Sequence, residues 1–489
     1  MSKTLLVAEK PSVGQDLARV LPGPFKKQEG FLEGPEHVIT WAVGHLVQLA
    51  EPEAYDAKYK SWRMNDLPIV PDRFKLEVRD ERSRKQMSVI SKQLAREDIE
   101  EVVNACDAGR EGELIFAYLY EQAKGKKPVK RLWLNSMTSA AMRDALAALR
   151  PGEELARLEQ AARSRSEADW IVGMNATRAA TIRLRSSFDG AVSLGRVQTP
   201  TLAIVARREE EIKAFKPEPY WLVDATFVGE PLANGDGAGG ERVYVGHYQA
   251  PPGGRAGSGS TKGPRLGSEQ EALAIVGACD GRLGTITKLE KKEQREKAPM
   301  LYDLTTLQRE ANNRYGFSAK RTLAAAQRLY EEHKALTYPR TNSRYLPSDM
   351  IEEIKPIAEL VGVHPNYSKG AQYVNSLDVL PLARVVNDEK VTDHHAIIPT
   401  RSEHNLEKMG SDDQRIYDMV ARRFLAVFHP EAVFENTRVE TTVMPAAGDG
   451  GHVFRTRGKL LLVPGWRGVY DEVAADAKGE GDGRGEEDE

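Results

Sequence analysis

The chain has 489 residues, which is too long for a single hydrophobic core, so we expect three or four domains. Hydrophobic residues make up 40% of the sequence and charged residues 29%, a composition typical of soluble globular proteins. No apolar run is long enough to span a membrane, and residues 5–8 are too short for a signal peptide, so we expect a cytoplasmic protein. The two cysteines, Cys106 and Cys279, are too few for a disulfide framework or a zinc ribbon.

The net charge of −3 conceals an asymmetry along the chain. Residues 471–489 contain nine acidic and two basic residues, so the rest of the chain carries +4. Positive charge is concentrated locally, in residues 178–185 and 291–297. This distribution permits phosphate binding, and it predicts an acidic, disordered tail at 471–489.

The first 152 residues alternate strands with helices, a pattern that predicts a parallel α/β sheet. The expected elements are strands at 4–8, 37–47 and 101–105 and helices at 13–21 and 114–123. Pro11 suits the start of a helix, so Glu9 and Lys10 should directly follow a strand. Asp107 and Glu111 follow another strand, in the run Asp-Ala-Gly-Arg-Glu-Gly-Glu. Because ligands collect at the carboxyl ends of parallel strands, these acidic residues should converge there.

Carboxylates gathered at one sheet edge predict a magnesium site. Mg²⁺ takes hard oxygen ligands and keeps several waters for substrate phosphates, so Glu9, Asp107 and Glu111 are the candidate ligands. The alternative is a solvated acidic loop. The specific acidic run after a buried strand favours the metal site.

Residues 153–215 are predicted to be helical and combine arginines with an indole, as in a groove that holds a single nucleic-acid strand and stacks its bases. The candidate strand-binding residues are Arg165, Asp169, Trp170, Asn175 and Arg178. The alternative, favoured by this segment alone, makes Trp170 a core anchor and the arginines a solvated face. Further along, Arg196 and Gln198 lie near the start of a second helix, where free N–H groups attract phosphate.

From Pro219 onward, alternating apolar and polar residues predict β-structure that is interrupted by helices. The expected regions are β-rich segments at 216–297 and 401–470, an exposed or disordered loop rich in Gly, Pro and Ser at 229–268, and an inserted helical domain at 298–400. In the inserted domain, Thr305 can cap one helix, and residues 318–334 form a second.

The second helix leads into Leu-Thr-Tyr-Pro-Arg-Thr-Asn-Ser at residues 336–343. Pro339 biases Tyr338 towards an extended conformation, so the tyrosine hydroxyl should project from a rigid corner. A tyrosine hydroxyl can act as a nucleophile, and the guanidinium of Arg340 can bind phosphate oxygens. Taken alone, a packing tyrosine beside a surface arginine is the simpler interpretation.

Two adjacent histidines, His394 and His395, occur near the end of the inserted domain. Neighbouring histidines cannot both face one ligand from a helix and no cysteine lies near them, so zinc is not expected. A histidine can bind phosphate or carry a proton near neutral pH. The alternative is a buried structural histidine.

Five motifs follow one another in the order found in a known family: residues 8–12, 107–113, 195–200, 337–341 and 394–400. The acidic run resembles the Toprim domain, and the five motifs together resemble type IA DNA topoisomerases, particularly the topoisomerase III branch. The resemblance implies a toroid-like protein of four domains. These would be a Toprim domain at 1–152, a helical DNA-gripping domain at 153–215, a β arch at 216–297 and 401–470, and the inserted tyrosine domain at 298–400.

The resemblance also implies a chemistry, in which Tyr338 becomes joined to a 5′ DNA phosphate and releases a 3′ hydroxyl. Arg340 and Lys10 would stabilise the phosphate, Lys10 or Glu9 would protonate the leaving oxygen, and His394 would lie in the active site. The family implies Mg²⁺, mainly single-stranded DNA as substrate, a monomer at the nucleoid and a helicase as a candidate partner. The sequence has no Gly-x-x-x-x-Gly-Lys loop, in keeping with religation without ATP.

Two features depart from the family pattern. Gly109 stands where the usual Asp-x-Asp pair has its second carboxylate. The segment that returns from the arch to the gripping domain is not found, so we expect poor cleavage and little relaxation of supercoils. Alternatives are a catalytically impaired DNA-binding fragment, a Toprim nuclease or primase, and the topoisomerase I branch.

Overall fold

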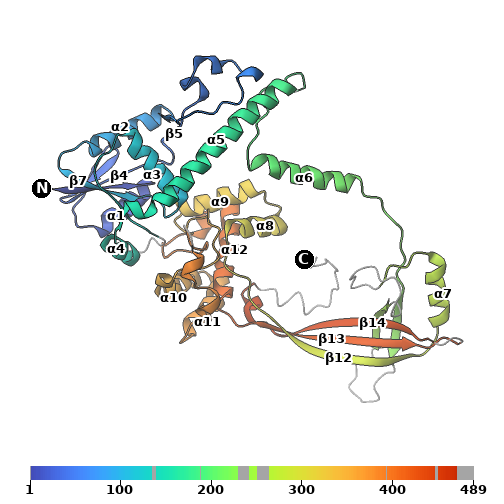
Figure 1. Ribbon diagram of the computed structural model, residues 1–489. Helices are drawn as coiled ribbons and strands as arrows, with labels where there is room; N and C mark the ends of the chain where they lie inside the picture. Colours follow the sequence, from blue (N-terminus) through green and yellow to red (C-terminus); the bar gives the residue numbers. More distant parts are fainter. Residues whose placement is uncertain are drawn as a thin grey trace. The chain divides into compact units, whose positions relative to one another are not determined.

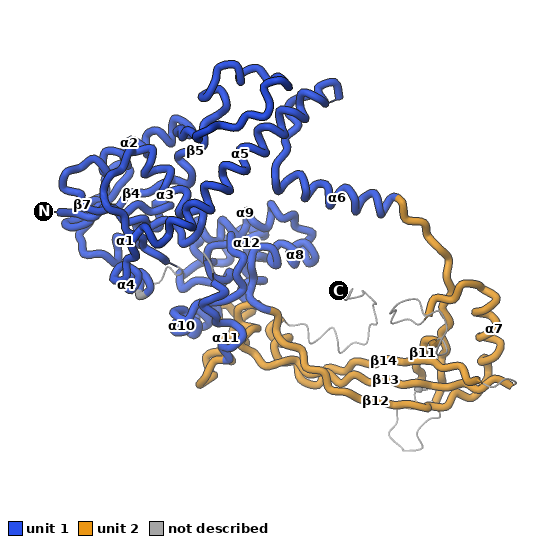
Figure 2. The backbone as a smooth tube through the Cα atoms, viewed as in Figure 1, with its two compact units in different colours: residues 1–213, 300–361, 381–421 blue, residues 214–299, 362–380, 422–489 orange. Residues whose placement is uncertain are grey.

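The computed structural model describes most of the chain, which divides into two compact units (Figure 2). The described residues are 2–134, 139–187, 189–229, 242–249, 264–391, 394–446 and 450–470. The first unit comprises residues 1–213, 300–361 and 381–421, and the second comprises 214–299, 362–380 and 422–489. All the catalytic and metal-binding residues expected from the sequence lie in the first unit.

A seven-stranded sheet in the order β2-β3-β4-β1-β7-β8-β9 forms the start of the first unit (Figure 1). Its strands are β1 (Lys3–Ala8), β2 (Lys26–Gln28), β3 (Phe31–Glu33), β4 (His37–Trp41), β7 (Ile99–Ala105), β8 (Val129–Arg131) and β9 (Arg150–Pro151). The central strands β4, β1, β7 and β8 are parallel, which confirms the predicted sheet. Leu5 and Val7 enter one core and Leu6 enters the other, because successive strand residues point to opposite faces.

The register of the sheet places two loops side by side. Ala8 of β1 lies beside Ala105 of β7, so the residues that follow each strand share one edge of the sheet. Helix α1 (Pro11–Val20) begins at Pro11, as predicted, and helix α3 (Arg110–Gln122) begins just after the acidic run. The remaining elements here are β5 (Val47–Leu49), β6 (Leu76–Val78), α2 (Glu81–Leu94) and α4 (Ser139–Ala147).

Two helices follow, the partly buried α5 (Ala156–Leu184) and the exposed α6 (Gln198–Lys213). The first unit is completed by a helical part that carries Tyr338. Its helices are α8 (Leu304–Tyr315), α9 (Ala319–Glu331), most of α10 (Ile351–Gly362) and the start of α12 (Ser411–Ala426).

The caps of the two helices before Tyr338 differ in part from the sequence-based expectation. Asp303, rather than Thr305, caps α8, because its carboxylate accepts a hydrogen bond of 2.6 Å from the Thr306 backbone N–H. Ser318 caps α9 in the same way. Helix α9 ends at Glu331, short of the predicted Lys334, whose backbone turns into the left-handed region with a φ of 54°.

The second unit is built on an antiparallel sheet in the order β10-β11-β14-β13-β12. Its elements are β10 (Asp224–Gly229), β11 (Arg242–Gln249), α7 (Glu269–Cys279), β12 (Gly284–Glu296), α11 (Pro365–Ser376), β13 (Ala432–Val443) and β14 (His452–Val463). A separate small core packs Val223, Tyr248 and Phe454. None of the described helices is long and apolar enough to cross a membrane.

Two predicted segment types need correction. Strand β11 falls inside the stretch 229–268 that composition predicted to be a loop, because its β-branched and aromatic residues Val243, Tyr244 and Val245 favour a strand and pair with β10. The stretch 401–470, expected to be β-rich, begins with helix α12. The predicted tail at 471–489 lies outside the described residues.

Candidate active site

Tyr338 is fixed by hydrogen bonds between its own segment and residues 394–400. The Thr337 backbone N–H donates to the Ile398 carbonyl at 3.0 Å, and the Thr337 hydroxyl donates to the Ala396 carbonyl at 3.2 Å. The Thr341 hydroxyl donates to the His394 carbonyl at 2.8 Å. These contacts bring His394 to the tyrosine although 56 residues separate them in the sequence.

The ring of Tyr338 has three close neighbours. The His394 ring lies 4.4 Å from it and the Tyr330 ring 5.4 Å, measured between centroids. The Lys10 ammonium lies 4.5 Å from the Tyr338 centroid. A cavity of about 250 Å³, here called the tyrosine cavity, is lined by these residues and by Asp107.

Glu9, Lys10 and Asp107 form a compact charged cluster beside the tyrosine. Lys10 Nζ lies 3.0 Å from Asp107 Oδ2 and 3.3 Å from Glu9 Oε1, and the Asp107 backbone N–H donates to Glu9 Oε2 at 3.4 Å. His394 Nε2 lies 3.4 Å from Asp107 Oδ2. The predicted convergence of Glu9 and Asp107 at the sheet edge is therefore confirmed.

The cluster shifts the pKa values of its members in different directions. Burial and the neighbouring Asp107 carboxylate raise the pKa of Glu9 above its ordinary value. Burial also disfavours the ionised form of Asp107, but the hydrogen bond with His394 and the charge of Lys10 outweigh it and hold the pKa of Asp107 below its ordinary value. Burial opposes the charge of Lys10, yet Asp107 and Glu9 keep its pKa above that of an ordinary lysine.

Tyr338 itself is held in its protonated form. Burial raises the pKa of the Tyr338 hydroxyl above its ordinary value, and the Lys10 ammonium opposes that rise. The guanidinium of Arg340 also opposes it, although Arg340 is exposed and its Nη2 donates to Gln327 Oε1 at 3.1 Å. Arg340 is thus turned towards helix α9, and its role at a phosphate stays a prediction.

A buried cation that we did not single out from the sequence supports the acidic run. Arg131, whose side chain is 1% exposed, lies 2.5 Å from the Glu113 carboxylate. Its other N–H groups donate to the backbone carbonyls of Asn104 at 3.1 Å, Cys106 at 2.7 Å and Asp107 at 2.7 Å. The one sequence feature that could have indicated this ion pair is a charged residue in the short strand β8, 18 residues after Glu113.

Glycine is required at one position of the acidic run. A Cβ at Gly112 would lie 2.0 Å from the Asp107 carbonyl oxygen, which leaves no room for a side chain. Gly109 is different, because its φ of −179° is extended and open to any residue. The backbone therefore does not account for the missing carboxylate at Gly109.

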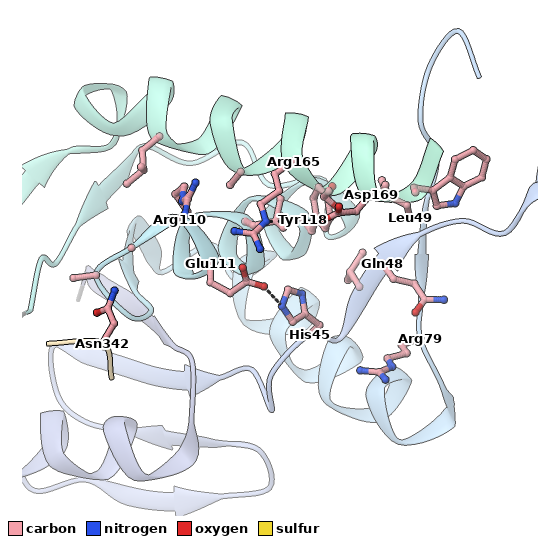
Figure 3. A pocket seen from close by; sticks show the side chains of 18 of the residues that line it. His45, Gln48, Leu49, Arg79, Arg110, Glu111, Tyr118, Arg165, Asp169 and Asn342 are labelled. Carbon is pink, nitrogen blue, oxygen red and sulfur yellow. Dashed lines mark hydrogen bonds and ion pairs between the residues drawn. The ribbon is translucent and has the colours of Figure 1, made fainter. Parts of the chain in front are cut away.

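Glu111, the third predicted metal ligand, points into a large groove beside helix α5 (Figure 3). Its carboxylate lies 2.6 Å from His45 Nε2, a partner that we did not anticipate, and this hydrogen bond lowers the pKa of Glu111. In the described part of the chain no three His, Cys, Asp or Glu side chains are grouped to hold a metal ion. A magnesium site that uses all three predicted carboxylates stays a prediction.

The groove beside α5, here called the α5 groove, has a volume of about 1050 Å³ and brings several cations together. Figure 3 shows Arg79, Arg110 and Arg165 around it, with Asp169 further along the same helix as Arg165. Asp169 lies 3.9 Å from Arg165 and 2.9 Å from Arg196.

A second groove, of about 770 Å³, continues from Asp169 past Arg196 and Gln198. Gln198 donates to the Ser193 hydroxyl at 3.0 Å. Arg165, Asp169, Arg196 and Gln198 are thus at groove surfaces, where a strand can reach them.

Three of the residues predicted to bind a nucleic-acid strand instead make contacts within the protein: Trp170, Asn175 and Arg178. Trp170 Nε1 donates to the Ala50 carbonyl at 3.1 Å, and its ring packs edge-on against Phe74, so it is a packing anchor at the wall of the α5 groove. The Asn175 amide exchanges two hydrogen bonds with the backbone of Ile69. Arg178 is 3% exposed and donates to the Tyr59 carbonyl.

The strand-binding role predicted for Asn175 and Arg178 is therefore corrected. Their polar groups are used to hold the segment between β5 and β6 against α5. The amphipathic pattern of α5 could not distinguish these two positions from Arg165, because only the covering segment decides which side of the helix is buried.

Comparison with known proteins finds similarity over nearly the whole chain. A family described as DNA topoisomerase matches residues 153–483, and a family described as Toprim domain matches residues 4–137. The chain is 42% identical to DNA topoisomerase 3 of Bacillus subtilis over 482 residues, which cover 99% of this chain and 62% of that protein. It is 43% identical to DNA topoisomerase 3 of Bacillus licheniformis over 96% of this chain and 60% of that protein.

The fold also matches a solved structure. Full-length topoisomerase I from Thermotoga maritima aligns with 95% of this chain and 67% of its own, with a TM-score of 0.61 and 20% sequence identity. At that identity the likeness concerns the fold alone. The chain spans about three fifths of the length of the curated relatives that it matches.

Proposed function

This chain belongs to the type IA DNA topoisomerases, in the topoisomerase III branch, and on that premise we propose that it cleaves and rejoins single DNA strands through Tyr338. The observation that supports this most directly is the position of Tyr338 against Lys10 and His394, with Asp107 in contact with both. A tyrosine that only packs would need neither an ammonium at its ring nor a carboxylate cluster behind it.

The proposed reaction is a transfer of one phosphodiester bond to the protein. The Tyr338 hydroxyl oxygen attacks a DNA phosphorus, the bond from phosphorus to the 3′ oxygen breaks, and Tyr338 becomes joined to the 5′ phosphate. The tyrosine gives its proton to solvent water, and the leaving 3′ oxygen gains one from Lys10 or Glu9, which is then reprotonated from solvent. Attack of the 3′ hydroxyl on the phosphotyrosine reverses both bond changes, so religation needs no nucleotide.

The chain's own residues would act mainly by positioning and charge, which is how phosphoryl transfer is generally catalysed. Lys10 holds its positive charge because its pKa is raised, and its ammonium lies 4.5 Å from the centre of the Tyr338 ring. Arg340 would turn from Gln327 to the phosphate. His394 would hold the ring of Tyr338 against Asp107.

Mg²⁺ is part of the proposal. Glu9 and Asp107 offer hard oxygen donors in adjacent positions beside Lys10, so this donor set fits the ion. Glu111 would be the third ligand after leaving His45. A bound ion would neutralise charge on a DNA phosphate next to the bond that is cut.

The substrate and its surroundings complete the proposal. A single strand would follow the α5 groove past Arg165 and reach Arg196 and Gln198. Strand passage would then give relaxation or decatenation of DNA. A nucleoid location, a monomeric chain and a helicase partner are expectations of the same proposal.

A covalent-capture experiment tests it. The chain is mixed with 5′-biotinylated, 3′-labelled single-stranded DNA and Mg²⁺ and quenched with denaturant, with Tyr338→Phe as the matched control. We expect an adduct that carries the 3′ label, because the fragment downstream of the cut stays on the protein. Tyr338→Phe should form no adduct while binding the DNA as well as the unaltered chain does.

The other outcomes separate the alternatives. Binding without any adduct would indicate a DNA-binding protein that does not cleave. Free fragments with 5′ phosphates, formed equally by Tyr338→Phe, would indicate a nuclease that uses the Toprim carboxylates.

A further inference from the structure

The second unit contains a three-stranded ribbon whose two faces differ in charge. Strands β12, β13 and β14 lie side by side over most of their length (Figure 1). Directly paired residues of antiparallel strands point to the same face, and the next residue of each strand points to the other. The register therefore assigns every side chain of the ribbon to one of two faces.

One face, here called the basic face, collects most of the positive charge. It is made of three successive rows, Lys288–Glu440–Arg455, Glu290–Arg438–Arg457 and Lys292–Asn436–Lys459. These rows hold six cations and two carboxylates. Positive charge therefore exceeds negative charge by four over a surface three strands wide.

The rows that alternate with these point to the opposite face of the ribbon, and they have no such excess of positive charge. They are Leu289–Val439–Thr456, Lys291–Thr437–Gly458 and Glu293–Glu435–Leu460. Lys291, the one cation of these three rows, is paired with Glu435 at 2.8 Å. The positive charge of the ribbon is thus concentrated on one face. Solubility alone would not require this, because charges spread over both faces would serve equally well.

The carboxylates of the basic face do not satisfy its cations. Glu440 accepts Arg438 at 2.6 Å and Arg455 at 3.3 Å, and Glu290 pairs with Lys288 at 3.0 Å. The buried Nε–H groups of Arg438 and Arg455 have no hydrogen-bond acceptor within the described residues.

Two further cations of this face are open to solvent. Lys292 and Arg457 are exposed, and among the residues described neither forms a hydrogen bond or an ion pair, although the charge of Lys292 acts on the neighbouring Glu290. Unsatisfied donors and exposed cations on one face favour an anionic ligand.

A groove of about 530 Å³ lies on this face. It is lined by Glu290, Lys292, Asn436, Thr437, Arg438, Arg457, Gly458 and Lys459. The lining offers guanidinium groups, which match phosphate oxygens in a planar fork, and one amide. No aromatic residue is among the described residues that line it, and the ring of Phe434, in the next row of the ribbon, has the Lys459 ammonium 3.9 Å from its centroid. Such a lining binds a backbone rather than reading bases.

We propose that the basic face binds the phosphate backbone of a second nucleic-acid segment, other than the one cleaved at Tyr338. The inference rests on the proposed function, because a nucleic acid is chosen over an acidic protein on the ground that the chain acts on DNA. The contact is independent of sequence, and Lys292, Arg438, Arg457 and Lys459 provide its charge.

The location is tested by photo-crosslinking on the full chain carrying Tyr338→Phe, which prevents cleavage. A photoreactive p-benzoylphenylalanine replaces Asn436 in one protein and Leu460, which is exposed on the opposite face and does not line the groove, in the other. We expect labelled single-stranded DNA to crosslink at position 436 at least several-fold more than at position 460. Equal crosslinking at the two positions, or none at 436, overturns the proposal.

The charge contribution is tested with two double variants that lose the same charge. Lys292→Ala with Arg457→Ala removes cations of the basic face, and Lys291→Ala with Arg295→Ala removes two cations of the opposite face. We expect the first pair to lower the slope of log affinity against log salt for single-stranded DNA by about 1.4, since each phosphate contact contributes about 0.7. The second pair should leave the slope unchanged, and equal slopes for the two pairs overturn the proposal.

Failure of this inference is distinguishable from failure of the cleavage proposal. A Tyr338 adduct together with an unchanged salt slope rejects only the basic face. A lowered slope with no adduct rejects strand cleavage and leaves the basic face as a binding site. If a poly-glutamate probe, and not DNA, loses affinity with the first double variant, the face binds acidic protein and the nucleic-acid proposal is wrong.

Discussion

Arg131 illustrates how one buried side chain can organise the candidate active site. It binds Glu113 and three backbone carbonyls at and beyond the carboxyl end of β7, directly under Asp107. Backbone carbonyls at the end of a buried strand must find donors, and here a single guanidinium supplies them. The loop that carries Asp107 is thereby held without using the Asp107 carboxylate, which stays available to Lys10 and His394.

Replacing Arg131 alone should be costly. Arg131→Met leaves the Glu113 carboxylate buried without its cation, and breaking such a pair typically costs about 3–5 kcal/mol of unfolding free energy. We expect this loss in the unfolding transition of the first unit, measured by urea titration. The double variant Arg131→Met with Glu113→Leu should recover much of it, because no unpaired charge remains. A single variant that loses less than about 1 kcal/mol would show that the pair contributes little.

At the scale of elements, the start of helix α8 anchors the segment that carries the tyrosine. Asp303 caps α8 through the Thr306 N–H and also pairs with Arg344 at 2.8 Å. The Leu304 N–H donates to the Thr341 carbonyl at 3.0 Å. The helix start and the residues just after Tyr338 therefore form one hydrogen-bonded group.

Two substitutions at Asp303 separate the cap from the ion pair. Asp303→Ala removes the cap and should cost about 0.5–2 kcal/mol, whereas Asp303→Asn keeps a capping oxygen and should cost much less. The ion pair is expected to matter little, because the Arg344 side chain is 45% exposed. Hydrogen exchange of the first amides of α8 measures both effects. Equal losses in the two variants would assign the stabilisation to the ion pair instead.

At the scale of the whole molecule, each of the two units contains a hydrophobic core. Leu5, Val102 and Leu119 belong to a core of the first unit, and Tyr248 and Phe454 belong to the core of the second. The chain enters and leaves the second unit more than once, since each unit is built from three stretches of sequence. Cooperative unfolding is expected within a core rather than across the chain.

Calorimetry should therefore resolve more than one unfolding transition. Phe454→Ala removes a side chain that is 1% exposed and should destabilise the second unit by about 3–5 kcal/mol, lowering the midpoint of one transition. Arg131→Met should lower the midpoint of the other. A single transition that both variants shift equally would show that the two units unfold as one.

Local patterns in the sequence were sufficient for much of this protein. An apolar run followed by Glu9 and Lys10, and another followed by Asp107, predicted two strand ends and their shared edge, because parallel strands place their carboxyl ends together. The segment around Tyr338 was recognisable from residues that are adjacent in the chain. These features depend on periodicity and on neighbours a few residues away.

Only the tertiary structure decided which distant residues meet. It paired Glu111 with His45, placed Arg131 against the Asp107 carbonyl, and buried Arg178 under a segment more than a hundred residues earlier. It also placed the cations of β12, β13 and β14 on one face through a register between strands far apart in sequence. The physical reason is that an amphipathic pattern shows only that a helix or strand has a buried face and an exposed face. Which residue each side chain meets depends on packing and on strand register, and these are not encoded in the neighbouring residues of the sequence.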